Sequence, residues 1–257
     1  MFQPPSPPGY TPVATTQDTS PPTYAAAGYD PEAAYPIDHK PLLKECEPNV
    51  RLGFVRKVYA ILSMQLGFTT IVAAFCMYHA GVKAFVQSHP TILIASCFAS
   101  ILLIFPLMIY RKQEPLNRIL LAAFTFVEAY IVGVVCASKD SETVLQATII
   151  TFGIFIGLTL YTLQSKLKFE GMQPFLFSSL LVLVQVMFLQ AFFPFNQAVD
   201  VIFTLFGAVL FCGYIVYDTY MMFEKYNLDE YIRAAVELYL DILNLFLRIL
   251  QLLSKKN

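Results

Sequence analysis

Long apolar runs alternate with short polar loops along this chain from Phe54 onward. Each run has about 20 residues, the length that an α-helix needs to cross the hydrocarbon core of a bilayer. Short loops between such runs make neighbouring helices antiparallel and leave no room for a soluble catalytic domain. The predicted spans are 56–79, 90–110, 116–136, 143–163, 174–194, 200–223 and 231–253. The pattern therefore predicts an all-α membrane protein with a seven-transmembrane-helix bundle over residues 49–257.

Composition supports the membrane class. The chain is 57% hydrophobic and 14% charged, whereas soluble domains are about 25% charged and less than half apolar. The formal net charge is −1, and no basic cluster with interleaved aromatic residues occurs. Membrane lipids are therefore expected partners, and nucleic acid is not. No histidine or cysteine spacing is typical of a metal site, so no cofactor is expected.

Basic residues near the helix ends predict the orientation, because Lys and Arg gather on the cytosolic side. With the N-terminus in the cytosol, only Lys83 and Lys139 of the counted residues lie on the opposite side. The cytosolic set is Arg51, Arg56, Lys57, Arg111, Lys112, Arg118, Lys166, Lys168, Lys225 and Arg233. Lys255 and Lys256 are the exception. Either the seventh segment crosses against the rule, or it is partly re-entrant and returns.

The seventh segment carries a stripe of polar residues on one face. Their steps of three and four residues follow the 3.6-residue period of a helix. The stripe is Glu230, Arg233, Glu237, Asp241, Asn244, Arg248, Gln251 and Lys255. A helix lying on the membrane surface would show such a stripe too, but usually with an excess of Lys and Arg. The balanced charge favours a central helix whose stripe faces a cavity lined by protein.

Two aspartates in the last two apolar segments, Asp218 and Asp241, are the candidate functional residues. An ionised carboxylate in low dielectric is costly unless it finds a partner or a proton. Because the segments are adjacent and antiparallel, both acids fall at comparable depth in the cytosolic half. We expect them to share a proton and titrate as a unit. The alternative is separate pairing of each acid with Arg248, Arg233 or a loop cation.

Four further polar residues are expected to support the same cavity: Glu237, Asn244, Arg248 and Glu128. For Glu128, the alternative is a hydrogen bond to a Ser, Thr or Tyr hydroxyl of a neighbouring helix. Glycines within the spans are expected to allow close helix packing, and GIFIG at 153–157 has the small-xxx-small spacing of such contacts.

The chain resembles the transmembrane Bax inhibitor motif family, especially its lifeguard branch, over about residues 50–253. The matching stretches are VRKVYAILSMQLGFT (55–69), FTFVEAYIVG (124–133), GYIVYDTYMM (213–222) and ELYLDILNLFLRIL (237–250). The resemblance implies seven helices with the last surrounded by the others, and a functional aspartate pair at Asp218 and Asp241. Glu237 departs from the small polar residue of many members, and Tyr220 from their Gln.

The resemblance further implies a pH-sensitive calcium leak from intracellular stores and suppression of cell death. Calcium would be the permeant ion, transiently held by Asp218 and Asp241, and Bcl-2-family or stress-signalling proteins are expected partners. The alternative is a non-conducting scaffold that modulates apoptosis through its cytosolic tail. No enzyme activity is expected. An intramembrane aspartyl protease would carry GxGD around its second aspartate, whereas Asp241 follows LYL.

Residues 1–48 form a segment rich in Pro, Tyr, Ala and Thr, with few aliphatic residues. Such a segment buries too little surface to fold, so it is expected to be a disordered cytosolic tail. It holds two PPxY motifs, which WW domains bind as polyproline II segments, so a WW-domain protein such as a ubiquitin ligase is an expected partner. Their key residues are Pro7, Pro8, Tyr10, Pro21, Pro22 and Tyr24.

A second tail motif, DHKPLL, resembles an acidic dileucine sorting signal built on Asp38, Leu42 and Leu43. The alternative is a solvated stretch of tail without a receptor. As a signal it points to the Golgi, endosome, vacuole or lysosome rather than the endoplasmic reticulum. The sequence leaves the intracellular compartment open among these.

Overall fold

The computed structural model describes residues 42–255 of the chain, and within this range the protein is almost entirely helical. Two short 3₁₀ turns, η1 (Leu43–Glu45) and η2 (Glu170–Met172), precede α1 and α6. The α-helices are α1 (Pro48–Tyr78), α2 (Ala80–Ser88), α3 (Pro90–Ile109), α4 (Leu116–Ala137), α5 (Ser141–Gln164), α6 (Gln173–Phe192), α7 (Gln197–Glu224) and α8 (Tyr231–Ser254). The predicted all-α class is confirmed for this part of the chain.

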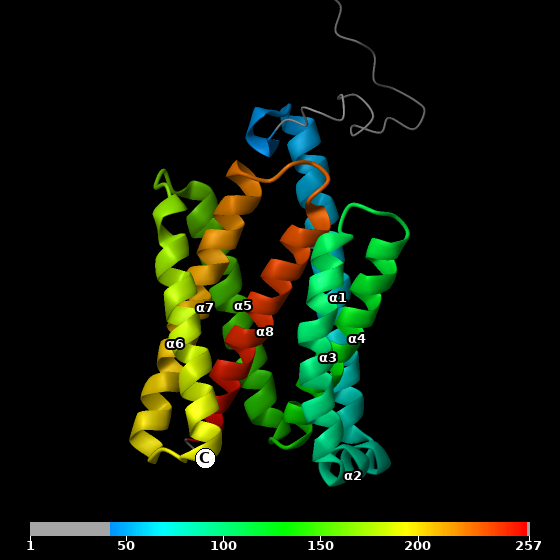
Figure 1. The fold of residues 1–257 in the computed structure, drawn as a ribbon, viewed down its shortest axis with the longest axis vertical. Coiled ribbons are helices and arrows are strands. Elements are labelled where there is room, and N and C mark those ends of the chain that lie inside the picture. Colours follow the sequence, from blue (N-terminus) through cyan, green and yellow to red (C-terminus); the bar gives the residue numbers. More distant parts are fainter. Residues whose placement is uncertain (1–41, 256–257) are drawn as a thin grey trace, which may run out of the picture.

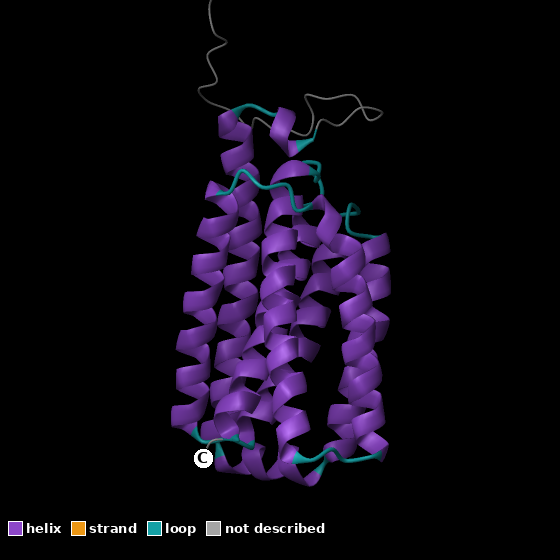
Figure 2. Cartoon of the chain, turned by 90° about the vertical axis from the view of Figure 1, so that its left-hand side faces the viewer, coloured by secondary structure: helices purple, strands orange, loops and turns teal. Residues whose placement is uncertain are grey.

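The long helices lie side by side along one axis, as Figures 1 and 2 show from two directions. In Figure 1, α8 runs obliquely between a group formed by α1, α3 and α4 and a group formed by α5, α6 and α7. It contacts α1, α4, α5 and α7. The connection from α7 to α8 lies at the same end of the bundle as the start of α1, and α8 ends at the opposite end.

Six helices are long and apolar enough to cross a membrane: α1, α3, α4, α5, α6 with its η2 turn, and α7. They coincide with six of the seven predicted spans. The exception is α8, because its stripe places Arg233, Glu237, Asp241 and Arg248 within a single helix. This helix is nevertheless continuous over 24 residues, from Tyr231 to Ser254.

The connection between the first two predicted spans contains a helix that the sequence pattern did not reveal. Residues 80–88, expected to be loop, form α2, which is too short to span a bilayer. The ring of His79 accepts a hydrogen bond from the Val82 backbone N–H at 3.3 Å and so caps the first turn. Val86 is buried against α1 and α4, and Val82 packs against the same cluster, so these two residues anchor α2.

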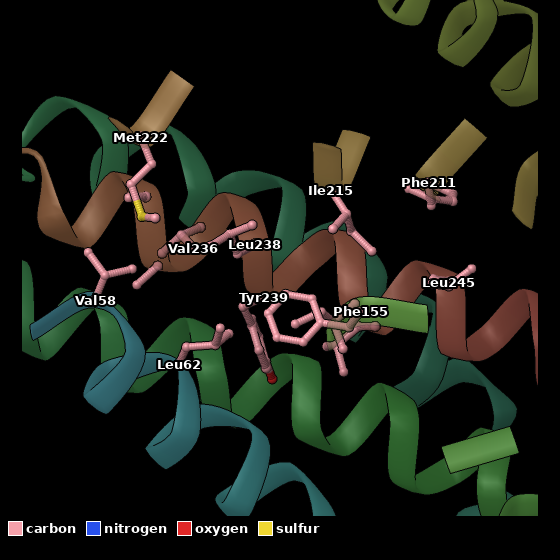
Figure 3. Close-up of a cluster of buried hydrophobic side chains, with 14 of the residues drawn as sticks. Val58, Leu62, Phe155, Phe211, Ile215, Met222, Val236, Leu238, Tyr239 and Leu245 are labelled. Atoms are coloured by element: carbon pink, nitrogen blue, oxygen red, sulfur yellow. The ribbon is translucent and has the colours of Figure 1, made fainter. Parts of the chain in front are cut away.

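Many of the buried side chains in the described part of the chain belong to α8. Its buried side chains include Leu238, Tyr239 and Leu245, each with no exposed surface. Figure 3 shows Tyr239 among residues contributed by α1, α5 and α7. The Tyr239 hydroxyl is hydrogen-bonded to Thr69 Oγ1 on α1 at 2.7 Å. Burial on this scale is not the arrangement of a helix lying on a membrane surface.

Glycines play the expected packing role at some positions only. A Cβ at Gly133 of α4 would lie 2.9 Å from Cys76 Sγ, so α1 and α4 approach closely there. By contrast, a Cβ at Gly153 or Gly157 would meet nothing within 4 Å. The two glycines of GIFIG are therefore exposed, although Phe155 between them is buried, and their predicted role in packing within the bundle is wrong.

Candidate functional site

The two candidate aspartates meet between the last two helices. Asp218 on α7 and Asp241 on α8 lie with their carboxyl groups within hydrogen-bonding reach of each other. The Asp241 side chain is buried, and its Oδ2 has no hydrogen-bond partner among the described residues. Two carboxylates at this separation repel unless one of them carries a proton, which then bridges them. The arrangement is therefore sensitive to protonation.

A second group of polar residues lies beside the aspartates, one turn nearer to the α7–α8 connection. Arg233 Nε donates a hydrogen bond to Glu237 Oε1 at 2.8 Å, and the Tyr226 hydroxyl also donates to Glu237. The Arg233 guanidinium lies over the Tyr226 ring, 4.7 Å from its centroid. Glu237 is thus paired with an arginine of its own helix, while its charge still acts on both aspartates.

Tyr226 belongs to the connection between α7 and α8 and lies outside the helices. Burial and the nearby Glu237 carboxylate both raise the pKa of its hydroxyl above the usual value of 10. The hydroxyl therefore remains protonated at neutral pH and can donate its hydrogen bond to Glu237. Arg233 and Glu237 thus form a charge-assisted ion pair next to Asp218 and Asp241, with Tyr226 as an additional hydrogen-bond donor.

Of the other predicted stripe residues, Arg248 contacts α7 and α6, whereas Asn244 bonds within α8. Arg248 packs on Gly207 of α7, where an added Cβ would lie 3.0 Å from its Nε, and donates a hydrogen bond to Met187 Sδ at 2.9 Å. Asn244 donates to the Leu240 carbonyl of its own helix at 2.8 Å. A pocket of about 450 Å³ opens elsewhere, between α1 and α4, and no stripe residue lines it. The cavity expected along the stripe stays a prediction.

Glu128 lies at the interface of α3 and α4, where it accepts a hydrogen bond from the Ser100 hydroxyl. This contact is the alternative that the sequence left open for this residue. The neutral donor allows Glu128 to be half-buried without a cationic partner.

The sequence did not single out a cluster at the other end of α7. Asp200, in the first turn of α7, forms an ion pair with Lys255, the residue that follows α8. Its Oδ1 accepts hydrogen bonds from Gln190 Nε2 at 2.9 Å and Gln251 Nε2 at 3.5 Å. Lys255 Nζ also donates to Thr204 Oγ1 at 3.2 Å. Gln251 and Lys255 belong to the polar stripe of α8, so the helical spacing of that stripe was the sequence signal that could have indicated this cluster.

The N-terminal segment is bound to the α7–α8 connection. Leu43 has no exposed surface, and its backbone N–H donates to the Tyr226 carbonyl at 2.8 Å. Leu42 is half-buried and forms an antiparallel bridge with Asn227. The folded part thus begins before residue 49. A sorting receptor would have to detach Leu43, so the dileucine signal stays a prediction; Asp38 lies outside the described residues.

Two ion pairs fasten the same connection to the loop between α3 and α4. Lys112 Nζ lies 2.9 Å from Asp229 Oδ2, and Arg111 Nη2 lies 3.0 Å from Glu230 Oε1. Both acids are buried, whereas Lys112 is largely exposed. The segment that joins the two aspartate-bearing helices is therefore held from two sides, by η1 and by the α3–α4 loop.

Both PPxY motifs, with Pro7, Pro8, Tyr10, Pro21, Pro22 and Tyr24, lie outside the described residues. Within residues 42–255, no group of three or more His, Cys, Asp or Glu side chains is placed to hold a metal ion. Asp218 and Asp241 thus offer a cation one pair of carboxyl groups, and any further oxygen ligands would have to come from water or backbone.

Comparisons with known proteins agree with this architecture. The sequence model described as "Inhibitor of apoptosis-promoting Bax1" matches residues 51–257. The chain is 44% identical to the "BI1-like protein" of Arabidopsis thaliana, over 84% of this chain and 85% of that protein. It is 41% identical to "Protein lifeguard 4" of Mus musculus, over 81% and 87%.

A third relative is the "Golgi anti-apoptotic protein" of Vaccinia virus (strain Lister), which is 41% identical over 81% of this chain and 88% of that protein. The residues matched by the sequence model, 51–257, include Asp218, Asp241 and the whole of α8. The chain therefore belongs to the family of inhibitors of apoptosis-promoting Bax1, the Bax inhibitor and lifeguard proteins.

Proposed function

We propose that this protein is a pH-sensitive calcium leak channel of an intracellular membrane, contributing to calcium homeostasis and to suppression of cell death. The observation that carries the proposal is the contact between the Asp218 and Asp241 carboxyl groups. In the proposed topology α8 is the seventh, central helix, the N-terminus is cytosolic, and the aspartates lie in the cytosolic half of the membrane.

The proposed gate is a latch that a proton closes. With one proton, the two carboxyl groups hold α7 and α8 together through a short, charge-assisted hydrogen bond. Loss of that proton as cytosolic pH rises leaves two adjacent negative charges, which separate the helices. The separated carboxylates then supply hard oxygen ligands to calcium moving down its gradient.

Other charged and titratable groups around the latch set the pH at which it opens. Glu237 and Arg233 of α8 act on Asp218 with opposite signs, and Tyr214 and Tyr217 of α7 lie close to it. Because Glu237 and Arg233 form an ion pair, Arg233 offsets part of the effect of Glu237 on Asp218. The proton on the aspartate pair is left as the principal switch.

The names of the relatives support the cellular part of the proposal. The viral relative is called a Golgi anti-apoptotic protein, and the family description refers to inhibition of Bax1. Both fit a role against cell death exercised from an internal membrane. Bcl-2-family or stress-signalling proteins are the partners that this role implies. The uninterrupted α8 around Asp241 supports a non-enzymatic role, since a protease would need backbone open to water and substrate.

Calcium flux into liposomes containing the purified protein, measured across a pH series, tests the gate. Asp218→Asn and Asp241→Asn variants should carry flux that no longer depends on pH, because an amide cannot lose the bridging proton. Asp140→Asn is the matched control, since this exposed residue precedes α5 without a side-chain capping bond. Wild-type pH dependence in both aspartate variants would contradict the mechanism.

The second candidate is a non-conducting scaffold that acts through its tail, and the paired PPxY motifs are the observation that favours it. Tyr10→Ala with Tyr24→Ala should abolish capture by a WW-domain ubiquitin ligase while leaving reconstituted flux intact. If purified protein carries no calcium while these tyrosines are required for protection from death stimuli, the scaffold replaces the channel.

A further inference from the structure

The end of the bundle away from the aspartate pair contains a cluster of oxygen-bearing side chains around the Asp200 carboxylate, with a cation beside it. Asp200 contributes a carboxylate, Thr204 a hydroxyl, and Gln190 and Gln251 two amides. The cation is the ammonium group of Lys255, which bonds to Asp200 and to Thr204. These residues come from α6, α7 and the end of α8.

The chemistry of the cluster is that of a site for a hard metal cation. Carboxylate, hydroxyl and amide oxygens are the ligands that calcium prefers. Each glutamine amide can turn to present its oxygen once the cation rather than the carboxylate occupies the centre. The side chains of Asp200 and Lys255 are 20% and 19% exposed, so the cluster can be reached from solvent at this end of the bundle.

We propose that this cluster is a second cation-binding site, for a divalent cation such as calcium, and that Lys255 is a tethered occupant which the cation displaces. This proposal extends the proposed channel function. The role of the site in calcium flux rests on that function, whereas calcium binding at the site does not. A lysine suits the task because its ammonium is a compact point charge on a flexible stem, able to leave without unfolding the helix.

The location places this site in series with the aspartate pair. Asp200 and Asp218 are 18 residues apart on α7, which corresponds to about 27 Å of helix. Asp241 and Lys255 are 14 residues apart on α8, or about 21 Å. Arg248 lies between them and forms no ion pair within residues 42–255, although Asp200 acts on it electrostatically. A cation bound at Asp200 would therefore be held back from the pair until Arg248 moves.

Calcium binding to the detergent-purified full chain, titrated with calcium chloride in a calorimeter, tests the site without relying on flux. Lys255→Gln should bind calcium about two- to fivefold more tightly, since a partly exposed ion pair no longer competes. Asp200→Asn should lose this binding. Lys139→Ala, at the same end of the bundle, is the matched control and should leave the affinity unchanged.

Unchanged affinity in Lys255→Gln, or retained binding in Asp200→Asn, would overturn the site, provided that thermal unfolding shows both variants folded. A Lys255→Arg variant separates competition from packing, because it keeps the charge and should bind no more tightly than wild type. In liposomes, Lys255→Gln should raise flux by a similar factor without altering its pH dependence. Calcium binding without any flux would support the cation site and reject the channel. Calcium flux that is unchanged in both variants would support the channel and reject a role for the cation site in flux.

Discussion

The two ends of the α7–α8 pair hold opposite kinds of contact. Near the α7–α8 connection an acid meets an acid, Asp218 against Asp241. At the other end an acid meets a base, Asp200 against Lys255. A carboxyl pair is stable only while it keeps a proton, whereas a carboxylate–ammonium pair is stable while both groups are charged. The first contact therefore responds to protons, and the second to competing cations and salt.

The two ends also differ in how firmly they are held. The α7–α8 connection is tied to the N-terminal segment through Leu43 and to the α3–α4 loop through two ion pairs. The opposite end relies on one cluster around Asp200 that is partly exposed. Segments with few buried contacts open at lower free-energy cost. We therefore expect the Asp200 end to open more readily than the end that carries the aspartate pair.

Removing the apolar side chain of Leu43, which anchors the end near the α7–α8 connection, should give the largest loss of stability. Leu43→Ala deletes a fully buried side chain, and such changes cost about 2–5 kcal/mol of unfolding free energy. Thermal unfolding and proteolysis of the segment before α1 would report the loss. Leu42→Ala is the control, because Leu42 is half-buried and contacts Asn227 through its backbone. Equal effects of the two substitutions would contradict an anchor at Leu43.

Neutralising the acid beside the pair should move its pH response. Glu237→Gln removes a negative charge that opposes ionisation of the aspartates and frees Arg233 to favour it. The midpoint of the pH-dependent flux should therefore fall, by about one pH unit. Glu224→Gln, an acid in the last turn of α7, should change the midpoint little. A rise in the midpoint on Glu237→Gln would show that the sign of this argument is wrong.

The close packing of Arg248 against α7, between the two ends, can be tested by replacing Gly207 with alanine and measuring thermal unfolding. Gly207→Ala places a Cβ 3.0 Å from Arg248 Nε, and we expect destabilisation by about 1 kcal/mol because the long side chain can shift. Gly153→Ala, where a Cβ meets nothing, should instead be neutral or slightly stabilising, since alanine favours a helix. Identical thermal unfolding of both variants would be inconsistent with this close contact.

The smallest effect is expected at Glu170, in the η2 turn at the same end as the aspartate pair. Its carboxylate lies 3.0 Å from Lys225 Nζ and accepts a hydrogen bond from the Tyr220 hydroxyl at 3.2 Å. The hydrogen bond and charge of Lys225, followed by Tyr220, lower the pKa of Glu170 below its usual 4.5.

A lowered folded-state pKa stabilises the fold above the ordinary pKa and loses that contribution as pH falls through the lowered value. Glu170→Gln should therefore reduce thermal stability slightly at pH 7 and not at all at strongly acidic pH. Glu142→Gln, where the carboxylate accepts from Gln146 without a lysine partner, should show no such pH-dependent difference. A constant difference at every pH would rule out the Lys225 contact as the cause.

The hydrophobic period alone located six spans and the amphipathic α8, because each extends over many residues and leaves a repeated signal. It missed α2, whose single buried residue, Val86, is too little apolar surface for a pattern. The small-xxx-small spacing of GIFIG also predicted close helix packing that the structure does not show. The spacing of two glycines does not indicate which helix, if any, lies opposite them. Local sequence cannot supply that information.

What the sequence by itself determined was the membrane class, the helix order and two acids at similar depth on antiparallel neighbours. Only the tertiary structure decided which charge meets which. It paired Glu237 with Arg233, set Asp218 against Asp241, and brought Lys255 to Asp200 across 55 residues of chain. Helical period fixes the face on which a side chain lies, but the rotation and offset of packed helices fix its partner.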